Sequence, residues 1–310
     1  MLLSLAGLSV RRIADAAPDA GEQDVVWRHH VARPPDGDAA AEASGRIGGE
    51  TPLVFGHGPR MRCRFAVSDD GRSVESWAAP DVADRDLVAL FGEHIMRSVL
   101  VRRGLLSFHA ASLSDGDGTI LIMGDKGAGK STLSFALQQR GWIPVADDLT
   151  RVAEGRGGWR AFAGLRATKL LAASLDAMGL EREQLAPRWE DPEGAADGKR
   201  LLAPASPPPP GAEALRVRAL LVLKPRRAKG DAVLRAASPF DAVRALLEHV
   251  TDDPACPGVL PSAPVQRQVG ALVRSLPILE VALPDRLDAL AASAEAVEGF
   301  VRRLSEPSRA

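Results

Sequence analysis

Short apolar runs separated by turn residues characterise the first part of the chain. Three of these runs, at residues 51–56, 61–67 and 72–79, have the length of strands and are bounded by Gly, Pro and Asp. Residues 35–50 lack such a pattern and read as a loop. We therefore expect a small β-rich region over residues 1–84.

A helical spacing of apolar residues begins at Asp86 and ends at Gly104, which is a natural helix C-cap. Two apolar runs, residues 105–113 and 119–124, then flank a turn rich in Gly and Asp, which predicts a hairpin or adjacent strands. The change in spacing predicts a second domain over residues 85–310.

Helical and strand-like segments alternate through the rest of the chain, as in an α/β domain. Helices are expected over residues 131–141, 238–250, 264–276 and 285–304, and strands over residues 142–148, 216–225 and 278–284. Residues 158–179 predict a strand or loop followed by a helix, residues 183–200 a polar loop, and residues 204–214 an extended, proline-rich connector.

Composition narrows the class of protein. Hydrophobic residues make up 45% and charged residues 25% of the 310 positions, the balance of an ordinary globular protein. A net charge of −1 argues against a general nucleic-acid-binding protein, which would carry a basic face. Cys63 and Cys256 have no metal-ligand spacing, and the N-terminus lacks the charge order of a secretory signal. With no apolar run of spanning length, we expect a cytoplasmic protein without a membrane partner.

The strongest chemical signal is MGDKGAGKST at residues 123–132. It contains the P-loop (Walker A) pattern G-x-x-x-x-G-K-[ST], whose glycines let backbone N–H groups turn towards phosphate oxygens while the following helix directs its positive end at the same anion. Lys130 can reach the β- and γ-phosphates of a nucleotide, and the Ser131 hydroxyl can ligate Mg²⁺. The predicted nucleotide-binding residues are Gly124, Asp125, Lys126, Gly127, Ala128, Gly129, Lys130, Ser131 and Thr132.

Two further elements accompany this motif. The acidic pair Asp147 and Asp148 ends the next predicted strand, and if that strand pairs beside the P-loop strand, both carboxylates reach the sheet edge of the γ-phosphate. One carboxylate can join the Mg²⁺ shell while the other accepts a proton from an attacking hydroxyl. His109 stands near the end of the strand that precedes the P-loop strand, which puts it in the same neighbourhood.

In this order, the three elements resemble the catalytic domain of HPr kinase/phosphorylase and its relatives, which are related to the phosphoenolpyruvate carboxykinases and include kinases encoded with lasso peptides. The likeness covers residues 108–152 continuously, FHAASLSDGDGTILIMGDKGAGKSTLSFALQQRGWIPVADDLTRV. That family has a His in an H-A/G strand, then a P-loop, then a strand that ends in A-D-D. The resemblance implies a P-loop, HPr-kinase-like α/β fold with a small β-rich part ahead of it, and the use of ATP and Mg²⁺.

The resemblance also implies a role for each matching residue. Lys130 and Ser131 would hold the nucleotide phosphates and Mg²⁺, and Asp148 would be the general base for the acceptor hydroxyl. Asp147 would bind the metal, and His109 would help to orient the base.

Outside the motif the match is looser. A basic residue in a later loop is implied to approach the phosphates, with Lys199 as the first candidate and Arg200 as the second. The bifunctional enzymes of the family carry an acidic residue in an E-x-R-G motif, whereas this chain has Ala161 at the comparable place. This departure argues against phosphorylase activity and against HPr as the substrate.

These observations favour a kinase that uses ATP and Mg²⁺ to phosphorylate a Ser-type hydroxyl on a peptide, a protein or a small molecule. The lack of N-K-x-D and L-S-G-G-Q motifs argues against a GTPase and a transporter ATPase. Two alternatives stay open: a non-catalytic, nucleotide-dependent binding or sensor protein, which would not need a base, and a simple NTPase, in which water replaces the hydroxyl. A homo-oligomer also stays open.

Overall fold

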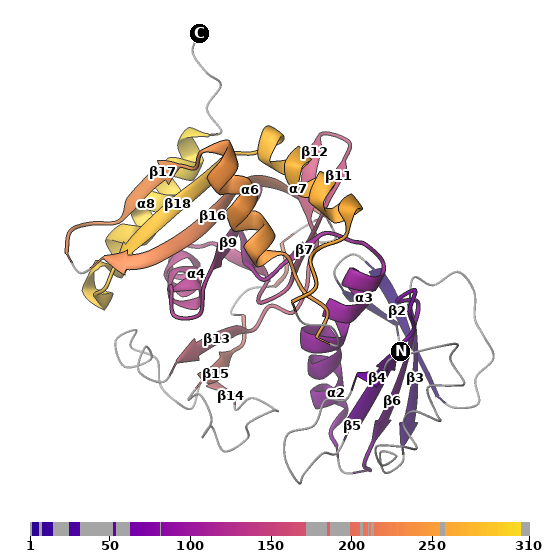
Figure 1. Cartoon of the computed structure of the whole chain (residues 1–310). Coiled ribbons are helices and arrows are strands. Elements are labelled where there is room, and N and C mark those ends of the chain that lie inside the picture. Colours follow the sequence, from indigo (N-terminus) through magenta and orange to yellow (C-terminus); the bar gives the residue numbers. More distant parts are fainter. Residues whose placement is uncertain are drawn as a thin grey trace. The chain divides into compact units, whose positions relative to one another are not determined.

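The computed structural model divides the chain into two compact units (Figure 1). Unit 1 comprises residues 1–107 and 251–265, and unit 2 comprises residues 108–250 and 266–310. The division into functional domains after residue 84 stays a prediction. The structure describes residues 2–5, 8–14, 25–31, 52–53, 63–80, 82–171, 185–186, 199–204, 207–209, 211, 214–227, 229–254 and 258–304.

Unit 1 contains a sheet whose described strands have the order β1-β2-β3-β6-β5-β4. They are β1 (Leu2–Leu5), β2 (Leu8–Ala14), β3 (Val25–Val31), β4 (Pro52–Leu53), β5 (Cys63–Val67) and β6 (Ser73–Ala78). Strands β5 and β6 confirm the predictions at residues 61–67 and 72–79, and β4 covers part of the run at residues 51–56. The strands therefore lie where the sequence predicts them, although β1 to β3 were not foreseen as separate strands, and a β-rich region bounded at residue 84 stays a prediction.

A helical segment follows the sheet of unit 1. It consists of α2 (Asp84–Leu90), one π-helical turn η2 (Phe91–Ile95) and α3 (Met96–Arg102). The segment confirms the predicted helix and stops before Gly104, whose φ of 64° is the left-handed conformation of a C-cap glycine. The buried Trp27 of β3 stacks on Phe91 with 4.3 Å between the ring centroids, which joins helix and sheet in one core.

Unit 2 is built on a sheet of nine strands among the described residues. One path runs β10-β8-β9-β16-β12-β11-β7, and β18 and then β17 extend the sheet beside β16. The strands are β7 (Ser107–Phe108, where the boundary between the units falls), β8 (Ala111–Ser114), β9 (Thr119–Gly124), β10 (Ile143–Ala146), β11 (Thr150–Gly155), β12 (Gly158–Ala161), β16 (Leu215–Arg227), β17 (Val233–Ala236) and β18 (Ile278–Pro284). Strands β8 and β9 form the predicted hairpin, and β16 runs parallel to both β9 and β18.

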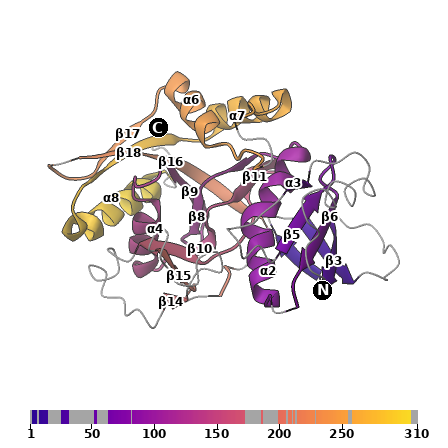
Figure 2. The same cartoon turned by 60° about the horizontal axis from the view of Figure 1, so that its bottom comes forward.

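The helices of unit 2 also follow the prediction. They are α4 (Lys130–Gln139), α6 (Pro239–His249), α7 (Ala263–Ser275), the short η4 (Leu287–Ala289) and α8 (Leu290–Arg303). Helix α6 starts as its sequence requires, because the Ser238 hydroxyl accepts the backbone N–H of Asp241 at 3.1 Å. Helices α4 and α8 lie together on one face of the sheet, and α6 and α7 lie on the other (Figure 2). No described helix is long and apolar enough to cross a membrane.

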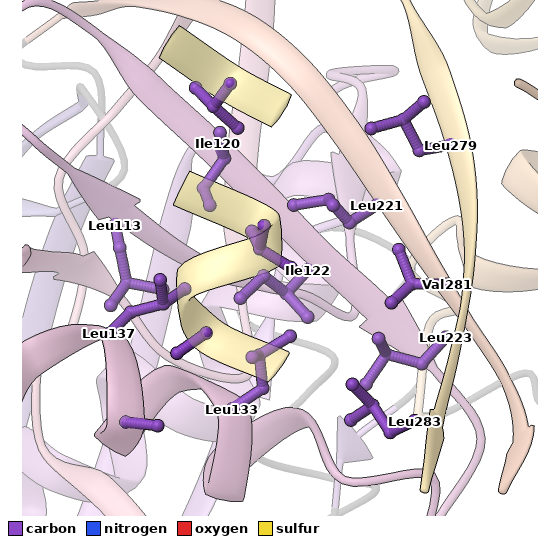
Figure 3. Packing of buried hydrophobic residues seen from close by; sticks show 14 of the residues in the cluster. Leu113, Ile120, Ile122, Leu133, Leu137, Leu221, Leu223, Leu279, Val281 and Leu283 are labelled. Carbon is purple, nitrogen blue, oxygen red and sulfur yellow. The ribbon is translucent and has the colours of Figure 1, made fainter. Parts of the chain in front are cut away.

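A buried apolar cluster joins the sheet to α4 and α8 (Figure 3). Its members come from the central strands and from the inner faces of the two helices, and include Ile120, Ile122, Leu133, Leu137, Leu221, Leu223, Val281, Leu283 and Val297. Burying each large aliphatic side chain contributes roughly 1.5–3 kcal/mol, so the cluster holds α4 firmly against the strands. The N-terminus of α4 is thereby fixed at the end of β9.

Two predicted segments differ in the structure. Residues 158–179 were expected to form a strand or loop and then a helix, but β12 is followed by a second strand, β13 (Thr168–Leu171), which pairs with β15 (Lys199–Leu202) in a small sheet with β14 (Leu185–Ala186). Short apolar runs fit either period, and here the cross-strand pairing decides. Residues 199–200 consequently lie in a strand and not in a loop, while most of the predicted helix and loop lies outside the described residues.

Candidate nucleotide-binding and catalytic site

The glycine-rich loop connects the end of β9 to the start of α4, which confirms the predicted strand before it and helix after it. Three of its residues have positive φ: Gly124 at 150°, Gly127 at 86° and Gly129 at 105°. Residues other than glycine rarely adopt these backbone conformations, which explains why glycine occurs at all three positions. At Gly124 space is a second reason, since a Cβ there would lie 2.8 Å from the Cβ of Leu223 on the neighbouring strand.

Lys130, Ser131 and Thr132 form the first turn of α4, directly after the loop. The ammonium group of Lys130 donates a hydrogen bond to the backbone carbonyl of Gly124, so its side chain folds back over the loop. The helix begins without a side-chain cap, and its first N–H groups and its positive dipole end face the loop. These features together can bind an anion at the centre of the loop.

The acidic pair reaches the same sheet edge by a route that differs from the prediction. Strand β10 does not pair beside β9, because β8 lies between them and is antiparallel to both. Two antiparallel steps restore the direction, so β10 and β9 end at the same edge. Asp147 and Asp148 therefore follow β10 where the loop follows β9, and His109 precedes β8 at that edge.

The structure brings His109 and Asp148 together. The His109 Nε2 and the Asp148 Oδ1 are 4.0 Å apart, an ion-pair distance when the imidazole is protonated. Both side chains are partly exposed, at 42% and 32%. Asp148 has a φ of 63°, which makes it the one non-glycine residue with positive φ in the described part of the chain. Such strain is typical of functional sites, and Asp and Asn tolerate it better than most residues.

Lys169 on β13 is a site residue that the sequence reasoning missed. Its ammonium group forms an ion pair with Asp148, and its backbone N–H donates to the Asp147 carboxylate at 3.2 Å. The side chain is only 10% exposed. A buried lysine rarely occurs without an acidic partner, so a single charge inside the apolar run ATKLLAA was the available signal.

Burial, and then the neighbouring Asp148 carboxylate, raise the pKa of Asp147 from 3.8 to about 7, although the Lys169 charge acts in the opposite direction. The folded protein therefore holds a proton that the unfolded chain releases between these two values. Because the folded state binds more protons in this window, its stability should fall as the pH rises from about 4 to 7.

Asp147→Asn should remove this loss, since the amide oxygen still accepts the Lys169 N–H and carries no charge. The variant should gain about 2–4 kcal/mol in free energy of unfolding over the parent between pH 5 and pH 8. Urea denaturation at both pH values measures the difference, with the exposed turn residue in Asp117→Asn as the matched control. A difference that does not depend on pH would show that Asp147 titrates normally.

His249, the last residue of α6, is a second neighbour of the loop that was not predicted. Its carbonyl accepts the His109 backbone N–H at 2.9 Å, which ties α6 to the start of β8. Burial lowers the pKa of the His249 ring, the charges of Lys130 and Lys224 add to this, and Asp125 opposes it. The ring is thus close enough to feel the loop charges.

For the remaining predicted residues, the structure gives no side-chain contact with the loop or with the acidic pair among the residues that it describes. Lys199 and Arg200 pair through their backbones with Leu171 and Leu170 on the strand that carries Lys169, and their side chains lie outside the described residues. Their approach to the phosphates stays a prediction. Ala161 is fully buried on β12, where an acidic side chain would meet an apolar core.

Mg²⁺ suits the donor chemistry of the site. Among the described residues no group of three His, Cys, Asp or Glu side chains is arranged to hold a metal. Mg²⁺, however, usually takes one or two protein carboxylates together with phosphate oxygens and water. Asp147 and Ser131 offer such oxygen donors, and one Lys169 charge leaves the ionised pair of aspartates with net negative charge.

Comparison with solved structures finds a remote likeness. The chain is similar to the Hpr(Ser) kinase/phosphatase from Coxiella burnetii, with 12% sequence identity and a TM-score of 0.30. The match covers 64% of this chain and 97% of that one. No family model and no curated protein matches the chain. Similarity at this level carries no conclusion about activity.

Proposed function

We propose that the protein is an ATP- and Mg²⁺-dependent kinase that transfers the γ-phosphoryl group to a Ser-type hydroxyl of a peptide, a protein or a small molecule. The observation that supports it most is the convergence of two groups at one sheet edge. The phosphate-binding loop follows β9, and a carboxylate held between Lys169 and His109 follows the parallel β10. A binding protein would need the first group only.

In the proposed reaction, the loop N–H groups and Lys130 hold the phosphates of ATP. Asp148 accepts the proton of the acceptor hydroxyl while that oxygen attacks the γ-phosphorus, and the bond to the ADP oxygen breaks. Lys169 and His109 keep the Asp148 carboxylate in place. Mg²⁺ bound by Ser131 and Asp147 would neutralise the charge that develops on the phosphate oxygens. Because Ala161 replaces an acidic residue, we propose no phosphorylase activity.

Lys130→Ala should test the nucleotide site. The variant removes the point charge beside the β- and γ-phosphates, and we expect ATP affinity to fall by about tenfold or more. Calorimetry with ATP and Mg²⁺ measures the affinity, and Lys229→Ala, at an exposed turn of unit 2, is the matched control. If binding and ATP turnover both match the parent, the loop is not a phosphate site.

The simple NTPase remains the second candidate, because Asp148 could equally activate water. ADP formation, measured with and without a serine-containing acceptor, separates the two activities. A kinase should produce more ADP when its acceptor is present and should label that acceptor with phosphate.

A further inference from the structure

One arginine of unit 1 is buried in the sheet with two of its nitrogen atoms unpaired. Arg64 of β5 is 8% exposed, and its Nε and Nη1 have no hydrogen-bond partner among the residues that the structure describes. Other arginines of this unit do have acidic partners: Arg97 donates to Asp252 at 2.7 Å, and Arg102 donates to Asp253 at 3.0 Å. A buried charge is unfavourable unless it is paired, and a guanidinium cannot avoid the penalty by losing its proton.

Strand pairing places Arg64 in a row with two aromatic side chains. Trp77 of β6 lies directly opposite Arg64 on one side and directly opposite His30 of β3 on the other. Residues that are opposite each other in neighbouring strands have their side chains on the same face of the sheet. The rings of Trp77 and His30 stack with 5.2 Å between their centroids and 11° between their planes. The row therefore joins one cation to a continuous aromatic surface.

The row lies on the face of the sheet that the helical segment of unit 1 does not cover. Side chains alternate between the faces along a strand, so Phe65, next to Arg64, is on the opposite face. There Phe65 and Trp27 pack together with 6.2 Å between their ring centroids, and Trp27 stacks on Phe91 of the helical segment. The apolar core of this unit is thus on one face, and Arg64 is on the other.

The charges in this sheet favour an anionic partner. The described strands carry four arginines but a single acidic residue, Glu75. Glu75 lies opposite Arg28, and its Oε2 is 3.6 Å from the Nε2 of His30, so its carboxylate is directed to the β3 side. The positive charge of Arg64 stays uncompensated, which suits one carboxylate. Arg and Trp are also the residues that most often dominate the binding energy of protein interfaces.

We propose that Arg64 anchors an acidic side chain, Asp or Glu, of a peptide or protein partner, while neighbouring partner residues pack on the rings of Trp77 and His30. The Nε and Nη1 groups donate charge-assisted hydrogen bonds to the bound carboxylate. Binding then relieves the unfavourable burial of an unpaired charge in the free protein. The three residues belong to unit 1 and take no part in the proposed reaction, so the assignment goes beyond the kinase and does not depend on it.

Two short peptides test the proposal by nuclear magnetic resonance. The probes are acetyl-Ala-Leu-Glu-Leu-Ala-amide and the same peptide with Gln in place of Glu, titrated at constant ionic strength. The indole N–H signal of Trp77, identified as the one missing in Trp77→Phe, reports binding. We expect the Glu peptide to bind at least about tenfold more tightly than the Gln peptide. This preference should vanish in Arg64→Met and persist in Arg85→Met, whose side chain in the parent is 88% exposed on α2.

Thermal unfolding of the free protein gives a second readout. Arg64→Met replaces an unpaired charge by an apolar chain of similar length, so the unfolding midpoint should rise by about 2–4 °C. A lower midpoint would mean that Arg64 supports the fold, and it would overturn the proposal. Equal affinity of the parent for the two peptides would do the same, and so would a preference for Glu that persists in Arg64→Met.

Two simple salts separate a polypeptide partner from other anions. Sodium propionate contains the carboxylate of a glutamate side chain without the peptide. If it shifts the Trp77 signal at the same concentration as the Glu peptide, the site binds free acids and the polypeptide partner is wrong. If sodium chloride does so as well, Arg64 binds an adventitious ion only. Much weaker effects of both salts would support the proposal.

Discussion

Asp148→Asn is expected to lower the rate of phosphoryl transfer by about 10²–10³-fold and to leave ATP affinity almost unchanged. Loss of a general base usually costs 10²–10⁴-fold, and the loose transition state of phosphoryl transfer makes only a modest demand on the base. Asparagine is the appropriate replacement, because it tolerates the positive φ of this position, whereas most residues would add strain. ADP formation at saturating ATP measures the rate, and calorimetry measures the affinity.

Asp117→Asn makes the same chemical change at an exposed position of the turn between β8 and β9 and should behave like the parent. Asp147→Asn should instead raise the Mg²⁺ concentration needed for half-maximal turnover. If Asp148→Asn turns over normally while Asp147→Asn loses the chemical step at saturating Mg²⁺, the two carboxylates have the opposite roles. If neither variant loses activity, a binding or sensor protein becomes the better hypothesis.

Lys169→Met should destabilise the protein by about 2–3 kcal/mol at pH 8. The substitution keeps the length of the buried chain but leaves Asp147 and Asp148 next to each other without their shared cation. Breaking a fully buried ion pair costs about 3–5 kcal/mol. Because Asp148 is partly exposed, the expected loss is smaller, about 2–3 kcal/mol. Urea denaturation monitored by circular dichroism measures the loss.

Two further variants separate charge from packing in this result. Lys229→Met, at an exposed position, should have almost no effect. Adding Asp147→Asn to Lys169→Met should recover much of the lost stability, since a single carboxylate then remains, and the two changes should be strongly non-additive. Additive effects would mean that Lys169 contributes through packing and not through its charge.

The sequence predicted the elements around the candidate site well, because each carries several agreeing signals. The segment from β8 to β10 has strand-like runs, a turn rich in Gly and Asp, and glycines at positions where the backbone needs positive φ. Helix α6 has a serine cap and an N-terminal proline. In such segments local preference and tertiary packing favour the same structure, which makes the prediction reliable.

The features that the sequence did not predict have a common cause, because each depends on contacts between segments that are distant along the chain. The insertion of β8 between β9 and β10 follows from strand pairing, and no local pattern specifies it. The strand at Lys169 exists because β15 pairs with it, although its apolar spacing also fits a helix. His249 binds the His109 backbone only because α6 ends beside the start of β8. The row of side chains that contains Arg64 likewise combines three separate strands.

The order of β8, β9, α4 and β10 along the chain has a consequence for folding and evolution. These elements are consecutive, so His109, the loop and the acidic pair lie within a run of about 40 residues, and their mutual contacts close short loops. During synthesis this run emerges long before β16 and β18, which complete the other side of β9. The residues of the proposed phosphate site are therefore encoded in one continuous segment, whereas the strands on the other side of β9 come from later parts of the chain. Recombination could move this segment as a unit, and a recipient chain would have to supply the strands that cover the other side of β9.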